Sequence, residues 1–153
     1  MKKTRWKVLF WLYVWFLFLV VILKFTGSFQ ELLARTQEDP YGRPYNLEPF
    51  STIGIQLQYA SEDWAKLNLI GNTLPFIPFG MLLHMAYRKE FSLLRGLVFG
   101  FLFVLIAETV QYYTKLGIFD VDDIILNMMA IFVGCIPGGI ARIFRKKKRK
   151  KKK

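Results

Sequence analysis

The stretch Leu93–Tyr113, with the sequence LLRGLVFGFLFVLIAETVQYY, decides the fold of this chain. After Arg95 it continues to Ala107 without a charged side chain, and it then carries Glu108 and Gln111 near its end. At about 1.5 Å per residue, a helix of this length crosses a hydrocarbon layer of about 30 Å. The stretch therefore predicts a membrane-spanning helix whose polar residues lie close to one membrane face.

Three further stretches are long and apolar enough, or nearly so, to cross a membrane: Val8–Leu23, Leu67–Tyr87 and Ile124–Phe144. No small-residue cleavage site follows Leu23, so we interpret the first stretch as an uncleaved anchor rather than a signal peptide. The sequence therefore predicts an all-α membrane protein, a four-transmembrane-helix bundle. Its expected parts are an N-terminal transmembrane anchor (1–24), an extracytoplasmic loop (25–66), a three-helix core (67–144) and a polybasic cytoplasmic tail (145–153).

The composition supports a membrane protein over a soluble one. Hydrophobic residues make up 54% of the chain, yet 22 Lys and Arg give it a formal net charge of +11. A soluble nucleic-acid-binding protein is the competing interpretation of this charge, but the long apolar stretches argue against it. Cys135 is the only cysteine, so an internal disulfide is excluded.

The positive charges predict the orientation of the bundle. They cluster before the first span, between the second and third, and after the fourth: Lys2, Lys3, Arg5 and Lys7; Arg88, Lys89 and Arg95; Arg142 and the run 145–153. With four crossings, all three clusters lie on one side, which the positive-inside rule makes cytoplasmic. Both termini are therefore expected in the cytoplasm, and the basic tail is expected on anionic lipid headgroups.

In this orientation, polar residues of three helices meet at the outer membrane face. They lie at the outer ends of the second, third and fourth spans: Asn68 and Asn72; Glu108 and Gln111; Asp120, Asp123 and Asn127. On two of these helices the polar face continues into small residues, among them Gly100 and Gly134, which let membrane helices approach closely. The polar groups should therefore point toward one another and away from lipid.

A simpler interpretation of some of these residues is helix capping. Asp120 or Asp123 can accept backbone N–H bonds at the start of the fourth span, and Asn68 can do so for the second. Glu108 has no such reason for its place, because the helix dipole disfavours a carboxylate near a helix C-terminus. A hydrogen bond to Gln111 or to a neighbouring asparagine is its structural alternative.

Pro75 and Pro78, followed by Gly80, predict a structural kink in the second span. Each proline lacks an N–H and displaces the carbonyl four residues earlier, so the oxygens of Gly71 and Leu74 are expected to be free toward the site. The alternative is a kink whose free carbonyls are satisfied by neighbouring side chains.

The order of these residues resembles the VanZ family of small bacterial membrane proteins. The resemblance rests on Asn68-x3-Asn72-x2-Pro75-Phe-Ile-Pro78-Phe-Gly80, then Glu108-x2-Gln111, then Asp120-x2-Asp123-x3-Asn127. The segment from Arg43 to Ile53 is similar to the family's segment between its first two spans. Two positions depart from the family pattern: Ile118 stands where an arginine commonly precedes the first aspartate, and Ala130 where a glycine commonly follows the asparagine.

The resemblance implies a multi-pass protein of the bacterial cytoplasmic membrane and a link to tolerance of glycopeptide antibiotics such as teicoplanin. In one hypothesis, the polar site binds an envelope component: a cell-wall precursor, a lipid headgroup or a glycopeptide or lipoglycopeptide antibiotic. In a second, it is a membrane enzyme for a lipid-linked envelope substrate, with Glu108, Asp120 and Asp123 as catalytic candidates. A structural role in an envelope complex is a third hypothesis.

We favour binding over catalysis, because the usual catalytic motifs are missing from the sequence. It has no Ser-His-Asp set and no metal-binding pair of histidines, since His84 is the only histidine. No cofactor, no resident metal and no nucleic-acid partner are expected. The expected partners are membrane lipids and, at the site, a cell-wall precursor or a glycopeptide.

Overall fold

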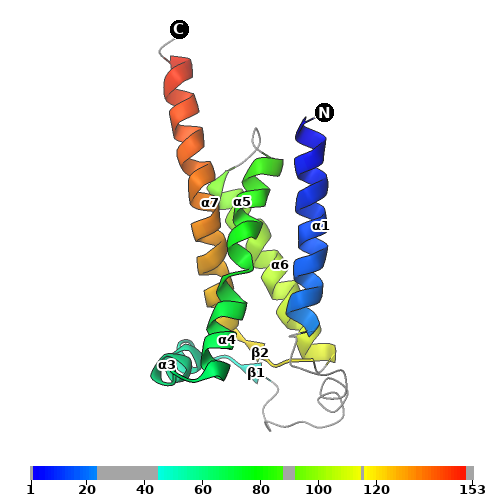
Figure 1. The fold of residues 1–153 in the computed structure, drawn as a ribbon, viewed down its shortest axis with the longest axis vertical. Coiled ribbons are helices and arrows are strands. Elements are labelled where there is room, and N and C mark those ends of the chain that lie inside the picture. Colours follow the sequence, from blue (N-terminus) through cyan, green and yellow to red (C-terminus); the bar gives the residue numbers. More distant parts are fainter. Residues whose placement is uncertain (1, 24–44, 88–91, 115, 151–153) are drawn as a thin grey trace.

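The computed structural model describes residues 2–23, 45–87, 92–114 and 116–150 (Figure 1). The elements in chain order are α1 (Lys2–Leu23), β1 (Tyr45–Asn46), α3 (Ser51–Gln58), α4 (Asp63–Thr73), α5 (Phe76–Ala86), α6 (Leu93–Thr114), β2 (Phe119–Asp120) and α7 (Val121–Lys150). Much of the predicted extracytoplasmic loop (24–44), the turn 88–91, Lys115 and the last residues of the tail (151–153) lie outside the described residues.

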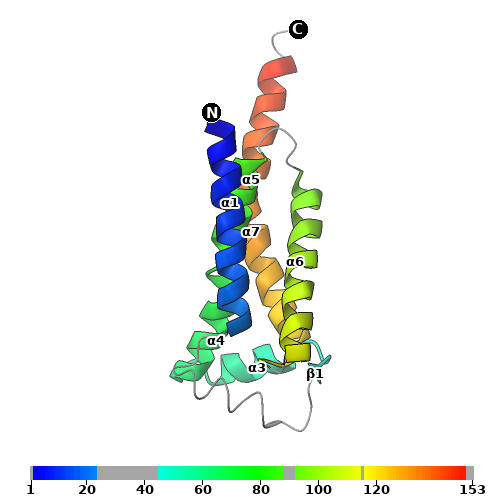
Figure 2. The same ribbon diagram turned by 90° about the vertical axis from the view of Figure 1, so that its right-hand side faces the viewer.

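The described chain is mostly helical, and its long helices run along a common direction (Figures 1 and 2). Three stretches are long and apolar enough to cross a membrane: Thr4–Ile22, Asp63–Ala86 and Leu93–Thr114. Helix α7, with Asp122 and Asp123 in its first turn and Pro137 within it, packs beside them but is not one of the three. The start of α1 and the end of α7 lie at the same end of the bundle (Figure 1).

The segment before the second span differs from the predicted plain loop. Helix α4 begins at Asp63, four residues before the expected start at Leu67, with the Asp63 carboxylate in the first turn, where the helix dipole favours an acid. The short helix α3 precedes it and lies across the end of the bundle (Figure 2). Its eight residues are too few for hydrophobic periodicity to identify a helix reliably.

The all-α expectation also missed a small sheet. Strands β1 and β2 pair in parallel, with Tyr45 opposite Phe119 and Asn46 opposite Asp120. Two-residue strands carry no periodicity, and their pairing joins segments that are more than seventy residues apart in the sequence. This pairing brings the polar residue Asn46 beside the start of α7.

The second span is broken into α4 and α5 at Leu74 and Pro75. Pro78 falls in the first turn of α5, where a backbone N–H has no helical partner in any case. Tyr13 of α1 donates a hydrogen bond to the Pro75 carbonyl at 2.6 Å, and Thr73 donates to the Leu69 carbonyl at 2.6 Å. Side chains therefore satisfy carbonyl groups around the break and attach α1 to it.

Glycines allow α5, α6 and α7 to pack closely. A Cβ atom on Gly80 would lie 2.5 Å from the Ile131 carbonyl oxygen, and one on Gly134 would overlap the Ile77 carbonyl oxygen. A Cβ on Gly100 of α6 would lie 2.9 Å from the Ile131 side chain. Both Gly100 and Gly134 therefore lie at helix contacts, as the small-residue pattern predicts.

An aromatic cluster joins α1 and α6 to α5. The Phe79 ring stacks on Phe99 at 5.9 Å and lies 5.2 Å from the Phe103 ring, while Phe10 of α1 meets Phe79 edge-on at 5.5 Å. Phe10, Phe79 and Phe103 are buried. The apolar core therefore fills the length of the bundle toward the termini, and the buried polar side chains gather at the opposite end.

A candidate polar site at one end of the bundle

The buried polar residues lie toward the ends of α4 and α6 and at the start of α7, beside β1, β2 and α3 (Figure 1). Eight polar or charged side chains are buried in the described part of the chain: Gln56, Asn72, Glu108, Gln111, Asp120, Asp122, Asp123 and Asn127. Polar groups of this kind are costly to desolvate unless they have hydrogen-bond partners. Their contacts therefore show how the site is built.

Asp123 connects α7 to α4. Its carboxylate accepts a short hydrogen bond from the side-chain amide of Asn72, and both side chains are buried. Asn127 follows Asp123 by one helical turn on the same face of α7 and is only 1% exposed. The pairing holds the start of α7 against the end of α4, next to the break at Pro75.

Asp120 collects three hydrogen bonds. Its carboxylate accepts from Thr52 Oγ1 at 2.7 Å, from Asn46 Nδ2 at 3.2 Å and from the backbone N–H of Asp122 at 2.9 Å. The last of these makes Asp120 the N-cap of α7, as the capping interpretation expects. Burial raises the pKa of Asp120 above its ordinary value, while the hydrogen bonds from Thr52 and Asp122 oppose that rise.

Glu108 reaches the same place from α6. Its side chain is 1% exposed, and its Oε2 atom accepts from the backbone N–H of Asp120 at 3.4 Å. This long hydrogen bond links the end of α6 to the start of α7. Glu108 and Asp120 therefore lie side by side in the site, and Asp123 follows within one turn of α7.

Asp122 points to α3. Its two carboxylate oxygens accept the backbone N–H groups of Phe50, at 2.6 Å, and Ile53, at 3.0 Å. These donors lie at the start of α3, where helical N–H groups have no partner within the helix. A fully buried aspartate of α7 thus caps α3, so hydrogen bonds attach α3 to the start of α7.

Two residues predicted for the site are placed differently. Asn68 is exposed on α4. Gln111 is fully buried, but its Nε2 atom donates to the Val21 carbonyl near the end of α1 at 2.7 Å. Gln111 therefore attaches α1 to α6, and Asn72, Glu108, Asp120, Asp123 and Asn127 form the compact part of the predicted set.

Within the site, the side-chain oxygen of Asn127 accepts no hydrogen bond from the described residues. In the described part of the chain, three buried amide oxygens have no hydrogen-bond partner: Gln56 Oε1, Gln111 Oε1 and Asn127 Oδ1. No group of three or more His, Cys, Asp or Glu side chains among the described residues is arranged to hold a metal ion. The arrangement suits recognition of a ligand through hydrogen bonds that the ligand donates.

Comparison with known proteins assigns the chain to a family. The model of the VanZ/LLP1 family matches residues 10–145, which include every residue of the site. The chain belongs to the VanZ/LLP1 family. Protein VanZ of Enterococcus faecium is 32% identical to it over 92 residues, which are 60% of this chain and 50% of that protein. The chain thus spans about half the length of this curated relative, and no solved structure matches it.

Sequence reasoning missed three side chains that complete the site in this VanZ-family protein. Asn46 and Thr52 bind Asp120, and Asp122 caps α3. Asn46 and Thr52 lie within the segment Arg43–Ile53 that carries part of the family resemblance, which was the one signal that pointed to them; Arg43 itself lies outside the described residues. No sequence pattern indicated that Asp122 caps α3, because its partners are backbone groups.

Proposed function

We propose that the cluster of Asn72, Glu108, Asp120, Asp123 and Asn127 recognises a component of the bacterial envelope at the outer face of the membrane. The observation that supports this proposal is that four elements bring these buried polar side chains to one end of an otherwise apolar bundle. A purely structural bundle gains little from burying carboxylates, because their desolvation is costly. Ligand recognition gives a reason for that cost.

The proposal includes a topology. The chain crosses the cytoplasmic membrane four times through α1, α4–α5, α6 and α7, with both termini in the cytoplasm and the polar site outside. The start of α1 and the end of α7 lie at one end of the bundle, which supports an even number of crossings (Figure 1). The basic residues near both termini then face the cytoplasm and its anionic headgroups.

The candidate ligands are a cell-wall precursor, a lipid headgroup and a glycopeptide or lipoglycopeptide antibiotic. Membership of the VanZ/LLP1 family and the likeness to Protein VanZ support a contribution to teicoplanin-type tolerance. The burial of Glu108 beside the N–H of Asp120 supports the second candidate function, a membrane enzyme with Glu108 as its general acid or base. The third candidate function, a structural role in an envelope complex, requires no ionised group.

The test measures teicoplanin tolerance and bound teicoplanin in cells that express single variants at matched membrane levels. Glu108→Ala, Asp123→Ala and Asn127→Ala are expected to abolish the tolerance that the parent confers. Asp63→Ala is the matched control, because its carboxylate is 95% exposed at the same end of the bundle. Full tolerance in all three site variants contradicts the proposal.

Glu108→Gln separates the candidate functions, since it keeps the shape of the side chain and loses the charge and the proton. Loss of tolerance with teicoplanin still bound favours acid–base chemistry. Loss of both favours recognition through the charge. Retention of both favours the structural role, in which the amide replaces the carboxylate as an acceptor from the Asp120 N–H.

A further inference from the structure

The segment between β1 and the body of α4 exposes many large apolar side chains. We call these side chains the outer apolar face: Leu47, Phe50, Ile55, Leu57, Trp64 and Leu67. Phe50 is 65% exposed, Leu57 60% and Leu67 71%. A short segment with this many exposed large apolar side chains is rare where a protein faces water and marks contact with a partner or a membrane.

The exposed ring of Phe50 is carried by an unusual backbone conformation. Phe50 has φ 67°, and it is the only non-glycine residue with positive φ in the described part of the chain. A bulky side chain in this region costs about 1–3 kcal/mol. The two hydrogen bonds to the buried Asp122 carboxylate hold the strained turn in place, and the result is an aromatic ring directed away from the protein.

The position of the outer apolar face points to lipid as its partner. Helix α3 lies across the end of the bundle, at the level where α4 begins (Figure 2). The face continues along α4 through Ile70 and Leu74, which are exposed on the apolar stretch Asp63–Ala86. Trp64 also packs against Tyr59 at 6.0 Å, and such aromatic residues favour the boundary between lipid and water.

We propose that α3 is an interfacial helix whose outer apolar face is inserted into the membrane leaflet at the polar end of the bundle. Phe50, at the N-cap of α3, and Leu57, in its last turn, are both strongly exposed and enter the acyl-chain boundary. Thr52 of α3 binds Asp120. The membrane surface thereby sets the depth of the polar site, and this inference does not depend on what the site binds.

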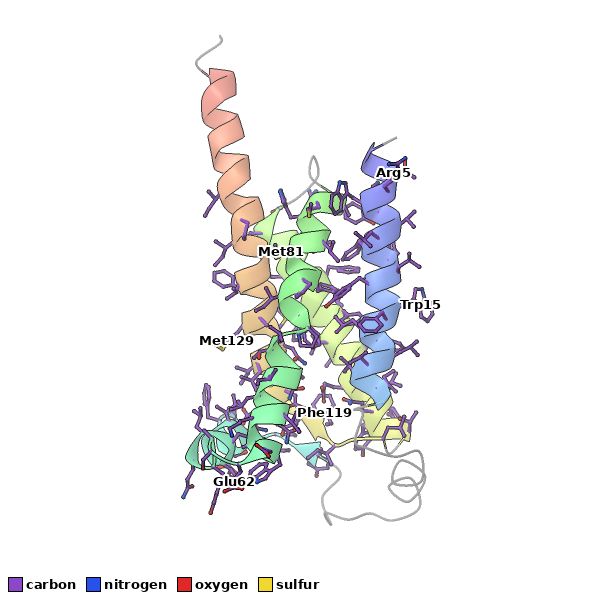
Figure 3. The ribbon with its side chains drawn as sticks, in the orientation of Figure 1. Arg5, Trp15, Glu62, Met81, Phe119 and Met129 are labelled. Carbon is purple, nitrogen blue, oxygen red and sulfur yellow. The ribbon has the colours of Figure 1, made fainter. Side chains whose placement is uncertain are left out.

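Tryptophan fluorescence in vesicles tests the insertion. The full chain is prepared with its four tryptophans replaced by phenylalanine, and single tryptophans are then introduced as Phe50→Trp or Leu57→Trp. Each protein is reconstituted into phosphatidylcholine vesicles with and without acyl-chain-brominated phosphatidylcholine. Acrylamide in the water is the second quencher. Glu62→Trp is the aqueous control, since Glu62 is exposed at the foot of α4 (Figure 3).

The expected result is that tryptophan at position 50 or 57 loses emission to brominated lipid and is protected from acrylamide. Trp15, retained as the single tryptophan, gives the reference for lipid contact, because it projects from the outside of α1 (Figure 3). Tryptophan at position 62 should be quenched by acrylamide and not by brominated lipid.

Two outcomes overturn the inference. If acrylamide quenches tryptophan at positions 50 and 57 as strongly as at position 62, the outer apolar face lies in water. Protection from both quenchers shows that protein covers it, either a second copy of the chain or another partner. If the introduced tryptophans prevent folding, the native Trp64, kept as the single tryptophan, decides the same question, since it is 47% exposed on the same face.

Discussion

At the scale of the residue, Asp120 and Asp122 show how neighbouring carboxylates take separate roles. Asp120 caps its own helix and holds two side chains from the segment around α3, whereas Asp122 is committed to backbone groups of Phe50 and Ile53. Each such bond to a charged acceptor contributes about 1.5–3 kcal/mol. The two bonds to Asp122 are therefore enough to offset the strain at Phe50.

Thr52→Val tests the balance at Asp120. Removing the hydroxyl removes a hydrogen bond that lowers the pKa, so the pKa of Asp120 should rise further above its ordinary value. At a pH where Asp120 is ionised, the variant should lose about 1.5–3 kcal/mol of unfolding free energy. Thermal unfolding in detergent measures the loss, and Thr52→Ser, which keeps the hydroxyl, is the control.

The sign of the pH dependence follows from the raised pKa. Because the folded state holds the Asp120 proton more tightly than the unfolded state, burying the ionised group costs stability at neutral pH, and this cost disappears as the pH falls through the folded pKa. The deficit of the Thr52→Val variant should shrink over the same range. A deficit that does not change with pH contradicts this account.

At the scale of the element, the contact of α5 with α7 depends on the lack of a side chain at Gly80 and Gly134. The two helices approach so closely that backbone atoms of each occupy the space where a Cβ atom of the other would lie. Such contacts take the place of the hydrophobic effect, which does not drive helices together within lipid. The small residues on the polar face of the fourth span predicted that Gly134 lies at a helix contact, whereas Gly80 was expected only as part of the kink.

Gly134→Ala should therefore destabilise the bundle, because its methyl group meets the Ile77 carbonyl oxygen, which belongs to the backbone and has little freedom to move. Overpacking of this kind costs about 1–3 kcal/mol or more. Gly71→Ala is the matched control: nothing lies within 4 Å of its Cβ position, and alanine there should stabilise α4 by up to about 1 kcal/mol. Equal thermal stability of the two variants in detergent would show that α5 and α7 are not in close contact.

At the scale of the whole molecule, the distribution of charge gives a topology that can be measured. Single cysteines at Ser61, Ser92 and Lys150 are introduced in a Cys135→Ala background, since Cys135 is the only native thiol. An impermeant thiol reagent on intact cells should label position 61 alone, because the four-crossing topology places only this position outside. Disrupted cells provide the control that all three positions can react. Labelling of position 92 or 150 in intact cells contradicts the topology.

The sequence predicted the large features because each rests on a long or repeated pattern. The spans around Phe103 and Phe10 follow from apolar length alone. The order of the spans predicted that Glu108 approaches the start of α7, where it accepts the Asp120 N–H. The expected fourth span, Ile124–Phe144, lies in α7, which is not among the three stretches able to cross a membrane in the described part of the chain. The exposure of Asn68 was not predicted. Asn68 and the buried Asn72 are one helical turn apart on the same face of α4, so the sequence pattern gave both the same expected burial. The partners of Asp122 could not be read from the sequence, since backbone N–H groups are the same at every non-proline residue.

The bonds from Asp122 to α3 also constrain the order in which the protein is assembled during its synthesis. The N–H groups of Phe50 and Ile53 emerge about seventy residues before their acceptor, as do Thr52 and Asn46 before Asp120. At about 5–20 residues per second, several seconds pass before these partners have been made. Throughout that interval, α3 lacks the contacts that define its start, so the segment made early is among the last to reach its final form.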